Sequence, residues 1–455
     1  MDFSTNSRIT DWDEFARCLD GIETIRHSAQ LEKLSKDYYH FSPILRSQLA
    51  DKVGDIVIKP KCEADVLQVA KACVEARVPL TVRGAGTGNY GQAIPLAGGV
   101  ILDMSEMCNI RWIQPGKACV EPGVKLAAID RAAQPAGWEI RMAPSTYRTA
   151  TIGGFIAGGS GGIGSVLYGQ LADRGNLQAV SVVTMEDTPR VIKLRGEAVQ
   201  QVNHAYGTNG IITELEIPLA PTYPWAEIVV VFNSFIQAAR FGQALGDADG
   251  IIKKLISIHA WPIPSYFSAL KSSLPTGKAA ALLIVSEADI QAARELAGVY
   301  GGEITHYKSS EEIGKGTAVA EFTWNHTTLH ARNADPNWTY LQTVFPYDPE
   351  LKLVQHMHKH FKDEVIMHLE FIRTDGNIVP AALQLVRYST AQRLQEIIEY
   401  HEAQGAFIAN PHTYVLEDGG RKIVDEKQLT FKEKVDPYGL LNPGKMRGWI
   451  ERHAR

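Results

Sequence analysis

The sequence predicts an α+β protein with two domains. Short apolar runs alternate with helical patterns from residue 54 onward. Two glycine-rich stretches, at 83–91 and 151–164, interrupt this alternation. Beyond Trp225 the pattern changes to strands and helices that include a hairpin, which is typical of an antiparallel sheet packed with helices. We therefore expect a first domain that closes near 221–224 and a second α+β domain built on an antiparallel sheet.

The elements of the first domain follow from hydrophobic spacing and from the placement of glycine and proline. Residues 1–50 are expected to be mainly helical, since Trp12, Phe15 and Leu19 recur at helical spacing. After residue 50 we expect strands at 55–60, 79–83, 100–104, 117–121 and 180–184, helices at 63–76 and 124–136, and a turn followed by a strand within 207–218.

The second domain follows the same rules. Thr374-Asp375-Gly376-Asn377 is typical of a turn between two strands, so a hairpin is expected there. The expected strands are 227–232, 280–285, 365–373 and 378–387, and the expected helices are 235–245 and 289–298.

Composition excludes several classes of protein. The chain has 455 residues, enough for two or three domains, and its formal charge of −5 argues against a nucleic-acid partner. We find no apolar run of about 18 residues, so no membrane-spanning helix is expected. The N-terminus lacks the features of a signal peptide. Five cysteines without a CxxC pair predict reduced thiols in a cytoplasmic protein, with no zinc cluster.

The two glycine-rich stretches carry the clearest functional signal. They read RGAGTGNYG at 83–91 and TIGGFIAGGSGGIG at 151–164. Glycine allows backbone N–H groups to gather around an anion and adopts positive φ without a Cβ clash. Two such stretches in one domain indicate a ligand long enough to touch both, such as a dinucleotide.

A nicotinamide-type site is excluded for the first stretch, although residues 86–91 spell GxGxxG. That site requires the glycine loop to open directly into a helix. Pro95 and the irregular segment 96–99 prevent a helix here. Asp103 follows the glycine loop at about the spacing expected of an acid that binds the ribose. In this sequence, however, it ends the strand-like run 100–102.

Several short motifs keep an order and spacing that are more specific than any single motif. They are VRGAGT at 82–87, TIGG at 151–154 with GG at 161–162, Tyr168-Gly169, GIIT at 210–213 and NPGK at 442–445. In these motifs the chain resembles FAD-linked oxidoreductases of the vanillyl-alcohol-oxidase/p-cresol-methylhydroxylase type. Its tail resembles the glycolate oxidase and D-lactate dehydrogenase branch. The resemblance covers 54–221 and the C-terminal residues well and the middle of the chain poorly.

The resemblance implies an FAD-binding domain of two subdomains over 1–221, an antiparallel-sheet cap or substrate domain over 222–420, and a segment at 421–455 that returns to the FAD domain. FAD would lie along both glycine-rich stretches. The residues implied to bind it are Arg83, Gly84, Ala85, Gly86, Thr87, Gly88, Gly91, Gln92, Pro144, Ser145, Thr146, Thr151, Ile152, Gly154, Gly161, Gly162, Ile211, Asn442 and Lys445.

Departures from the family pattern refine this expectation. Some members attach FAD covalently through a histidine in the first loop, where this chain has Thr87. No cysteine follows Cys119, so a covalent bond from a cysteine in the second stretch is absent too. Non-covalent FAD is therefore predicted, with a link to a cap histidine left open. The histidines of the branch's metal and carboxylate site are missing from the segments 373–377 and 415–420. We therefore predict no metal, and the missing histidines argue against a simple 2-hydroxy acid within the substrate classes considered below.

Flavin oxidation of a C–H bond often needs a base to accept a proton. In the strand expected at 365–373, His368 and Glu370 share one face, either as a base with its orienting carboxylate or as a solvated outer face. If residues 321–328 form a strand, His326 would share a face with its second neighbours 324 and 328 and would line a pocket or pack in the core. Tyr168 would lie near the flavin by family position. A weaker third candidate is the pair at 412 and 414.

The sequence leaves two functions of different classes open. The first is an FAD-dependent oxidase or dehydrogenase that takes a hydride from an alcohol, a hydroxy acid or an aromatic carbinol. Its small-molecule substrate would reduce the flavin, which O₂ or an electron carrier would reoxidise. The alternative is a flavoprotein subunit, or a non-catalytic docking component, of a larger complex. The oligomeric state stays open, with a homo-oligomer among the alternatives.

Overall fold

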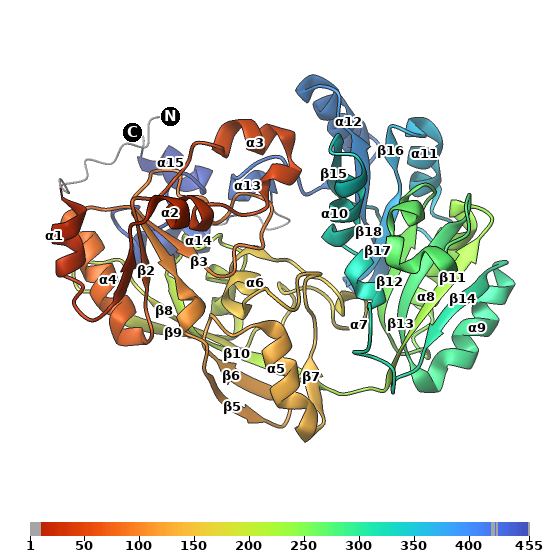
Figure 1. Ribbon diagram of the computed structural model, residues 1–455, viewed down its shortest axis with the longest axis horizontal. Helices are drawn as coiled ribbons and strands as arrows, with labels where there is room; N and C mark the ends of the chain where they lie inside the picture. Colours follow the sequence, from red (N-terminus) through yellow and green to blue (C-terminus); the bar gives the residue numbers. More distant parts are fainter. Residues whose placement is uncertain (1–10, 420–423, 425, 454–455) are drawn as a thin grey trace.

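The computed structural model describes residues 11–419, 424 and 426–453. In Figure 1 two sheets from the first half of the chain lie on one side and a third sheet from the second half lies on the other. The predicted α+β class is confirmed. The α-helices in the first half of the chain are α1 (Trp12–Arg17), α2 (Ser28–Leu34), α3 (Pro43–Leu49), α4 (Glu63–Ala76), α5 (Leu126–Ala133), α6 (Ile152–Gly158) and α7 (Ser165–Tyr168).

The first sheet has the order β1-β2-β4-β3, with the last three strands parallel. These strands are β1 (Glu23–Ile25), β2 (Ile56–Lys59), β3 (Leu80–Arg83) and β4 (Val100–Asp103). Helix α4 connects β2 to β3 and packs its apolar face, including Val66 and Val69, on the sheet. The helical prediction for residues 1–50 misses β1, which is only three residues long and pairs at the sheet edge.

The second sheet is antiparallel and is centred on an eleven-residue strand, β10. Its order is β5-β6-β10-β8-β9, and β7 also pairs with β10. The prediction misses β5, β7 and β9, which are short and partly exposed and so lack a continuous apolar run. The strands are β5 (Ile110–Gln114), β6 (Lys117–Val120), β7 (Trp138–Ile140), β8 (Ala179–Val183), β9 (Val191–Arg195) and β10 (Ile211–Pro221).

The third sheet is antiparallel throughout its described strands, in the order β14-β11-β13-β12-β17-β18-β15-β19, with β16 on β18. These strands are β11 (Trp225–Phe232), β12 (Lys253–His259), β13 (Ala279–Ser286), β14 (Glu303–Lys308), β15 (Trp338–Val344), β16 (Val365–Ile366), β17 (His368–Thr374), β18 (Asn377–Arg387) and β19 (Phe407–Ile408). The accompanying helices are α8 (Phe235–Asp247), α9 (Ile290–Val299), α10 (Asn325–Ala334), α11 (Lys352–Phe361) and α12 (Ala391–Ala403). The predicted hairpin joins β17 to β18.

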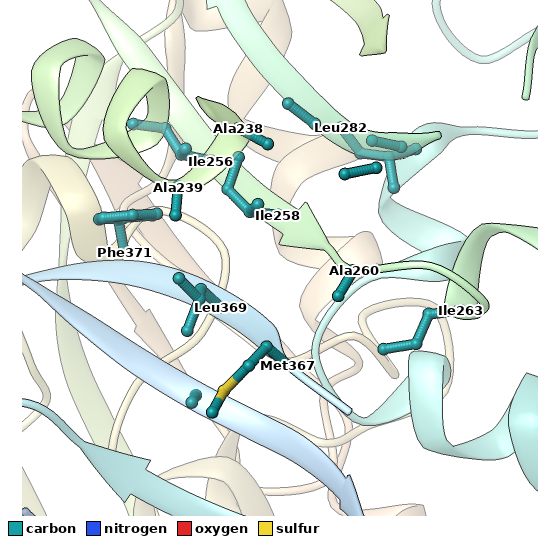
Figure 2. Packing of buried hydrophobic residues seen from close by; sticks show 14 of the residues in the cluster. Ala238, Ala239, Ile256, Ile258, Ala260, Ile263, Leu282, Met367, Leu369 and Phe371 are labelled. Carbon is teal, nitrogen blue, oxygen red and sulfur yellow. The ribbon is translucent and has the colours of Figure 1, made fainter. Parts of the chain in front are cut away.

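Helix α8 covers one face of this sheet. Figure 2 shows Leu369 and Phe371 of β17 beside Ala239 and Ile258. A Cβ added at Gly242 of α8 would lie 2.7 Å from the Phe371 ring, so this ring packs directly against the helix backbone. Because side chains alternate along a strand, the intervening residues of β17 point to the other face.

The C-terminal segment packs on the first sheet. Its helices are α13 (Leu416–Gly419), α14 (Glu426–Val435) and α15 (Arg447–His453). Leu80 of β3 donates its N–H to Leu440 O at 2.8 Å and accepts from the N–H of Asn442 at 2.7 Å. The tail thus extends the edge of the parallel sheet directly below the first glycine-rich stretch.

A buried ion pair fixes this tail. Lys432 and Asp436 are both buried, and the Lys432 ammonium also donates to Thr208 O at 2.8 Å and to Leu441 O at 3.1 Å. Removing one partner of a buried pair leaves an uncompensated charge. Lys432→Met is therefore expected to lower the free energy of unfolding by about 3–5 kcal/mol, measured by urea denaturation. The exposed Lys434→Met should change it by less than about 0.5 kcal/mol; equal effects would contradict the role of the pair.

In the described ranges no helix is both long and apolar enough to cross a membrane.

Candidate functional site

A cavity of about 280 Å³ lies where both glycine-rich stretches meet residues of the second half of the chain. The sequence-predicted residues that line it are Gly84, Ala85, Gly86, Thr87, Gly88, Gln92, Pro144, Ser145, Thr146, Thr151, Gly154, Gly161 and His326. From the second half of the chain, α10 contributes Trp324, at its start, and Asn325, and β15 contributes Gln342. The structure therefore brings the two stretches together with one of the predicted bases.

The first stretch leaves β3 as an irregular loop whose N–H groups are left for a ligand. Among the described residues, no protein acceptor pairs with the N–H groups of 85–89. Gly86 has a φ of +65°, and a Cβ there would lie 2.0 Å from the Arg83 guanidinium. Arg83 itself lies beneath the loop and donates to Lys36 O at 2.7 Å. Successive free N–H groups of this kind form an anion site, as a phosphate requires.

The second stretch differs from the expected loop, because residues 152–158 form helix α6. Ile152, Phe155 and Ile156 recur at helical spacing and are buried in the core of the second sheet. This packing outweighs the poor helix propensity of glycine. A Cβ at Gly154 would approach only Thr151 Oγ1, at 3.2 Å, so the backbone lies bare toward the cavity.

The predicted tail residues hold the first loop from behind rather than line the cavity. The Asn442 amide donates to Gln92 O at 2.9 Å and to Tyr206 O. The fully buried Lys445 ammonium donates to Gly91 O. These contacts fix the carbonyls at the end of the loop, so direct contact of Asn442, Lys445 or Gly91 with a ligand stays a prediction.

An acidic residue without any signal in the sequence lies beside this loop. Asp37 lines the cavity and accepts from the N–H groups of Tyr39, at 2.9 Å, and Ala93, at 3.4 Å. Burial raises the pKa of Asp37 to about 6, although these bonds and Lys445 oppose the shift. Burial also lowers the pKa of Lys445 to about 7, against the attraction of Asp37. The local charge thus changes near neutral pH.

The strand expected around His326 is wrong. Residues 319–322 form a 3-10 helix, a turn follows, and α10 begins at Asn325. Trp324 has φ +52° and ψ −138°, and the His326 N–H donates to Thr323 O at 3.1 Å. This is the geometry of a type II′ turn, whose first central position favours glycine. A tryptophan there costs on the order of 1–3 kcal/mol, and no glycine or proline in the sequence marks the turn.

His326 is the predicted base that the structure places in the cavity lining. Its Nδ1 lies 3.6 Å from Glu321 Oε2, too far for a hydrogen bond but close enough for attraction. Burial lowers the pKa of His326, while Glu321 opposes that shift. The imidazole is therefore neutral at neutral pH and is able to accept a proton.

The second predicted base lies elsewhere. His368 and Glu370 do share a face of β17, with His368 Nε2 2.9 Å from Glu370 Oε1. Both side chains are buried, at 0% and 1% exposure, so the solvated outer face is wrong. They are not among the residues that line the cavity, so the direct base assigned to them is not supported either.

Four other predicted residues lie outside the lining, namely Tyr168, Ile152, Gly162 and Ile211. Tyr168 lies near the Arg141 guanidinium, 5.8 Å from its ring centre, and burial raises its pKa to about 12. The others pack beside the wall; Ile211, for example, precedes the lining residue Ile212. The prediction missed several lining residues: Tyr38, Phe41, Asn89, Tyr90, His204, Tyr206, Gln342 and Ala409. Asn89 and Tyr90 lie in the first stretch but are not glycines, Gln342 lies on β15, and the others lie in segments that carry no motif.

Comparison with known proteins identifies the domain that carries both glycine-rich stretches. The FAD binding domain family matches residues 54–192, which include both stretches. Glycolate oxidase subunit GlcD of Escherichia coli is 32% identical over 209 residues, covering 43% of this chain and 41% of the relative. The match thus spans about two fifths of that protein's length. GlcD of Bacillus subtilis is 25% identical over 426 residues, covering 86% and 88%, and a D-lactate dehydrogenase of Archaeoglobus fulgidus is 27% identical over 225 residues, covering 45% and 49%.

Solved structures extend the similarity to the whole fold. Alkyldihydroxyacetonephosphate synthase aligns with a TM-score of 0.71 at 17% identity, covering 96% of this chain and 85% of that one. A BBE-like protein of Physcomitrella patens aligns with a TM-score of 0.67 at 13% identity, covering 94% and 98%. The free N–H groups of the first loop and the bare backbone at Gly154 fit a dinucleotide phosphate. The chain therefore carries an FAD binding domain over residues 54–192, and its relatives include a glycolate oxidase subunit and a D-lactate dehydrogenase.

Proposed function

We propose that the protein is an FAD-dependent oxidoreductase that oxidises a CH–OH group of a small molecule. The observation that carries this proposal is a cavity that joins the FAD binding domain to a neutral histidine, His326. Bound FAD would supply the hydride acceptor. His326 would accept the hydroxyl proton, and Glu321, 3.6 Å away, would stabilise the resulting imidazolium.

Some of the predicted FAD-binding residues would contact the cofactor, and others would support the first loop. We propose that Gly84 to Gly88, Thr151, Gly154 and Gly161 contact the cofactor, with Gln92 and the turn 144–146 completing the wall. Arg83, Asn442 and Lys445 would hold the first loop in shape. Thr87 offers no ring nitrogen for a covalent bond, which supports non-covalent FAD.

We also propose a substrate class, an electron acceptor and a cellular compartment for the protein. The relatives are named for glycolate and D-lactate, and for this chain we propose an alcohol, a hydroxy acid or an aromatic carbinol. The acceptor would be O₂ or an electron carrier. The five cysteines form no disulfide, which supports a reducing, cytoplasmic setting. We propose the domain limits 1–221, 222–420 and 421–455; the end of the second sheet at Pro221 and the start of the third at Trp225 support the first limit, and the limit at 420/421 lies outside the described residues.

Anaerobic spectroscopy tests the proposed function. Purified protein should carry FAD absorbance, and one member of a panel of alcohols, hydroxy acids and aromatic carbinols should bleach it without O₂. A protein that takes up FAD but is bleached by no compound of the panel would contradict oxidation of these substrates. Bleaching only after addition of a partner would favour the alternative of a flavoprotein subunit.

Asp37 and Lys445 predict how FAD affinity depends on pH. Below about pH 6 the pair carries +1 charge, because Asp37 is protonated, and above about pH 7 it carries −1, because Lys445 is neutral. An anionic cofactor should therefore bind more weakly as pH rises through 6 to 7. Fluorescence titration with FAD should show this fall. Asp37→Asn should bind FAD more tightly at pH 7.5 and lose the step that comes from the carboxyl, while the Lys445 step moves to lower pH because Asp37 no longer supports the ammonium charge; an unchanged profile would contradict the assignment.

A further inference from the structure

A closed polar cluster lies inside the third sheet, behind the cavity wall. It consists of Ser257 and His259 of β12, His368 and Glu370 of β17, and Thr327 of α10, all buried. Glu370 Oε1 accepts from Ser257 Oγ at 2.7 Å and lies 2.9 Å from His368 Nε2. The same oxygen accepts from the backbone N–H of Trp324 at 2.7 Å. One carboxylate oxygen therefore ties two central strands to the turn before α10.

Stability alone explains this cluster poorly. A buried carboxylate is costly, and here Glu370 Oε2 has no hydrogen-bond partner among the described residues. His259 stacks on His368, with ring centres 4.5 Å apart, and burial together with His368 holds the pKa of His259 well below its ordinary value. His259 is therefore neutral, and the imidazole placed to pair with the carboxylate is that of His368, 2.9 Å away. A carboxylate that costs stability here is explained if it holds a neighbouring group in place.

The group that Glu370 holds is the strained residue of the site. The N–H that it accepts belongs to Trp324, at φ +52°. Trp324 and the next two residues, Asn325 and His326, all line the cavity. The direction of His326 therefore depends on the backbone that the carboxylate holds.

We propose that Glu370 is a positioning residue, which holds the Trp324 turn through its amide and thereby sets the place of His326 at the cavity. The proposal rests on the proposed function, since it concerns the base assigned there. Glu370 does not touch the substrate; it acts through the turn. Ser257 donates a hydrogen bond to the carboxylate oxygen, and His368 Nε2 lies within hydrogen-bond distance of it. Both side chains therefore orient the carboxylate.

Hydrogen exchange measured by mass spectrometry tests the turn directly, without any substrate. Glu370→Leu removes the acceptor at similar volume, so exchange in peptides covering 319–330 should rise about tenfold or more. Glu370→Gln keeps one oxygen but replaces a charge-assisted bond with a neutral one, so the rise should be about threefold. Adding Trp324→Gly to Glu370→Leu should restore part of the protection, because glycine adopts this φ freely.

A matched control separates positioning from general stability. Gln384 is equally buried in the same sheet and binds Thr343 and His401, away from the turn. Gln384→Leu should lower Tm but leave exchange at 319–330 unchanged. With the substrate found by the panel, Glu370→Leu should slow flavin reduction about tenfold or more with FAD affinity unchanged within about twofold.

The outcomes distinguish this proposal from the proposed function. Unchanged exchange at 319–330 in Glu370→Leu, with Tm lowered as in Gln384→Leu, would overturn the positioning role. A loosened turn with an unchanged rate of flavin reduction would overturn it as well. If Glu370→Leu does not fold, Glu370→Gln carries the same measurements. A panel without any substrate would count against the function, while the exchange data would still decide whether Glu370 holds the turn.

Discussion

Gly154→Asp is expected to abolish FAD binding while the protein stays folded. The Gly154 backbone lies bare at the cavity, and a Cβ there meets only Thr151 Oγ1, at 3.2 Å, so a side chain would project toward the ligand. A carboxylate in that place would repel the pyrophosphate at short range in a site of low dielectric constant. The same acid lies in the first turn of α6, where negative charge favours the helix. Affinity for FAD should fall at least about a hundredfold, equivalent to about 2.7 kcal/mol, in a fluorescence titration.

Two variants at the same position separate charge from volume. Gly154→Asn has almost the shape of aspartate without its charge and should lose clearly less affinity. Gly154→Ala adds only the Cβ and should lose least. Equal losses in the Asp and Asn variants would mean that volume alone excludes the ligand. An Asp variant that retains FAD would show that the cofactor does not pass α6.

The sequence predicts the fold best where hydrophobic spacing is long and regular. Helix α4 begins and ends at the predicted residues, Glu63 and Ala76, because its apolar face packs on a buried parallel sheet. The hairpin of β17 and β18 is predicted for a similar reason, since both strands are largely buried and a typical turn joins them. Short edge strands such as β9 escape prediction because exposed residues interrupt any apolar run along them.

The site is predicted only in part, since long-range packing decides the rest. Glycines of the first stretch are recognisable because their backbone conformation and crowding demand glycine. Helix α6 is not, because its stability comes from the core that receives Phe155 and Ile156. The turn at Trp324 contradicts local preference, and a carboxylate 46 residues further along the chain holds it. Such a tether leaves no local signal in the sequence.

His326→Gln is expected to stop flavin reduction and leave FAD bound. Glutamine is polar and of similar size, but it cannot accept the proton that leaves the substrate hydroxyl. General-base catalysis contributes typically a hundredfold to ten thousandfold, so the rate constant of anaerobic flavin reduction should fall within about that range. His330→Gln is the matched control, because His330 lies on the same helix, binds Glu321 O at 3.0 Å and does not line the cavity. It should keep the wild-type rate within about threefold.

The pH dependence gives a second, independent test of the same base. Burial lowers the pKa of His326, so the rate of flavin reduction should fall only as pH drops below the ordinary histidine range. Glu321 opposes that shift by attracting the imidazolium. Glu321→Gln removes the attraction, lowers the pKa further and should move the acidic limb of the profile to lower pH. A limb that stays in place in Glu321→Gln, or survives in His326→Gln, would assign the titrating group to another residue of the cavity.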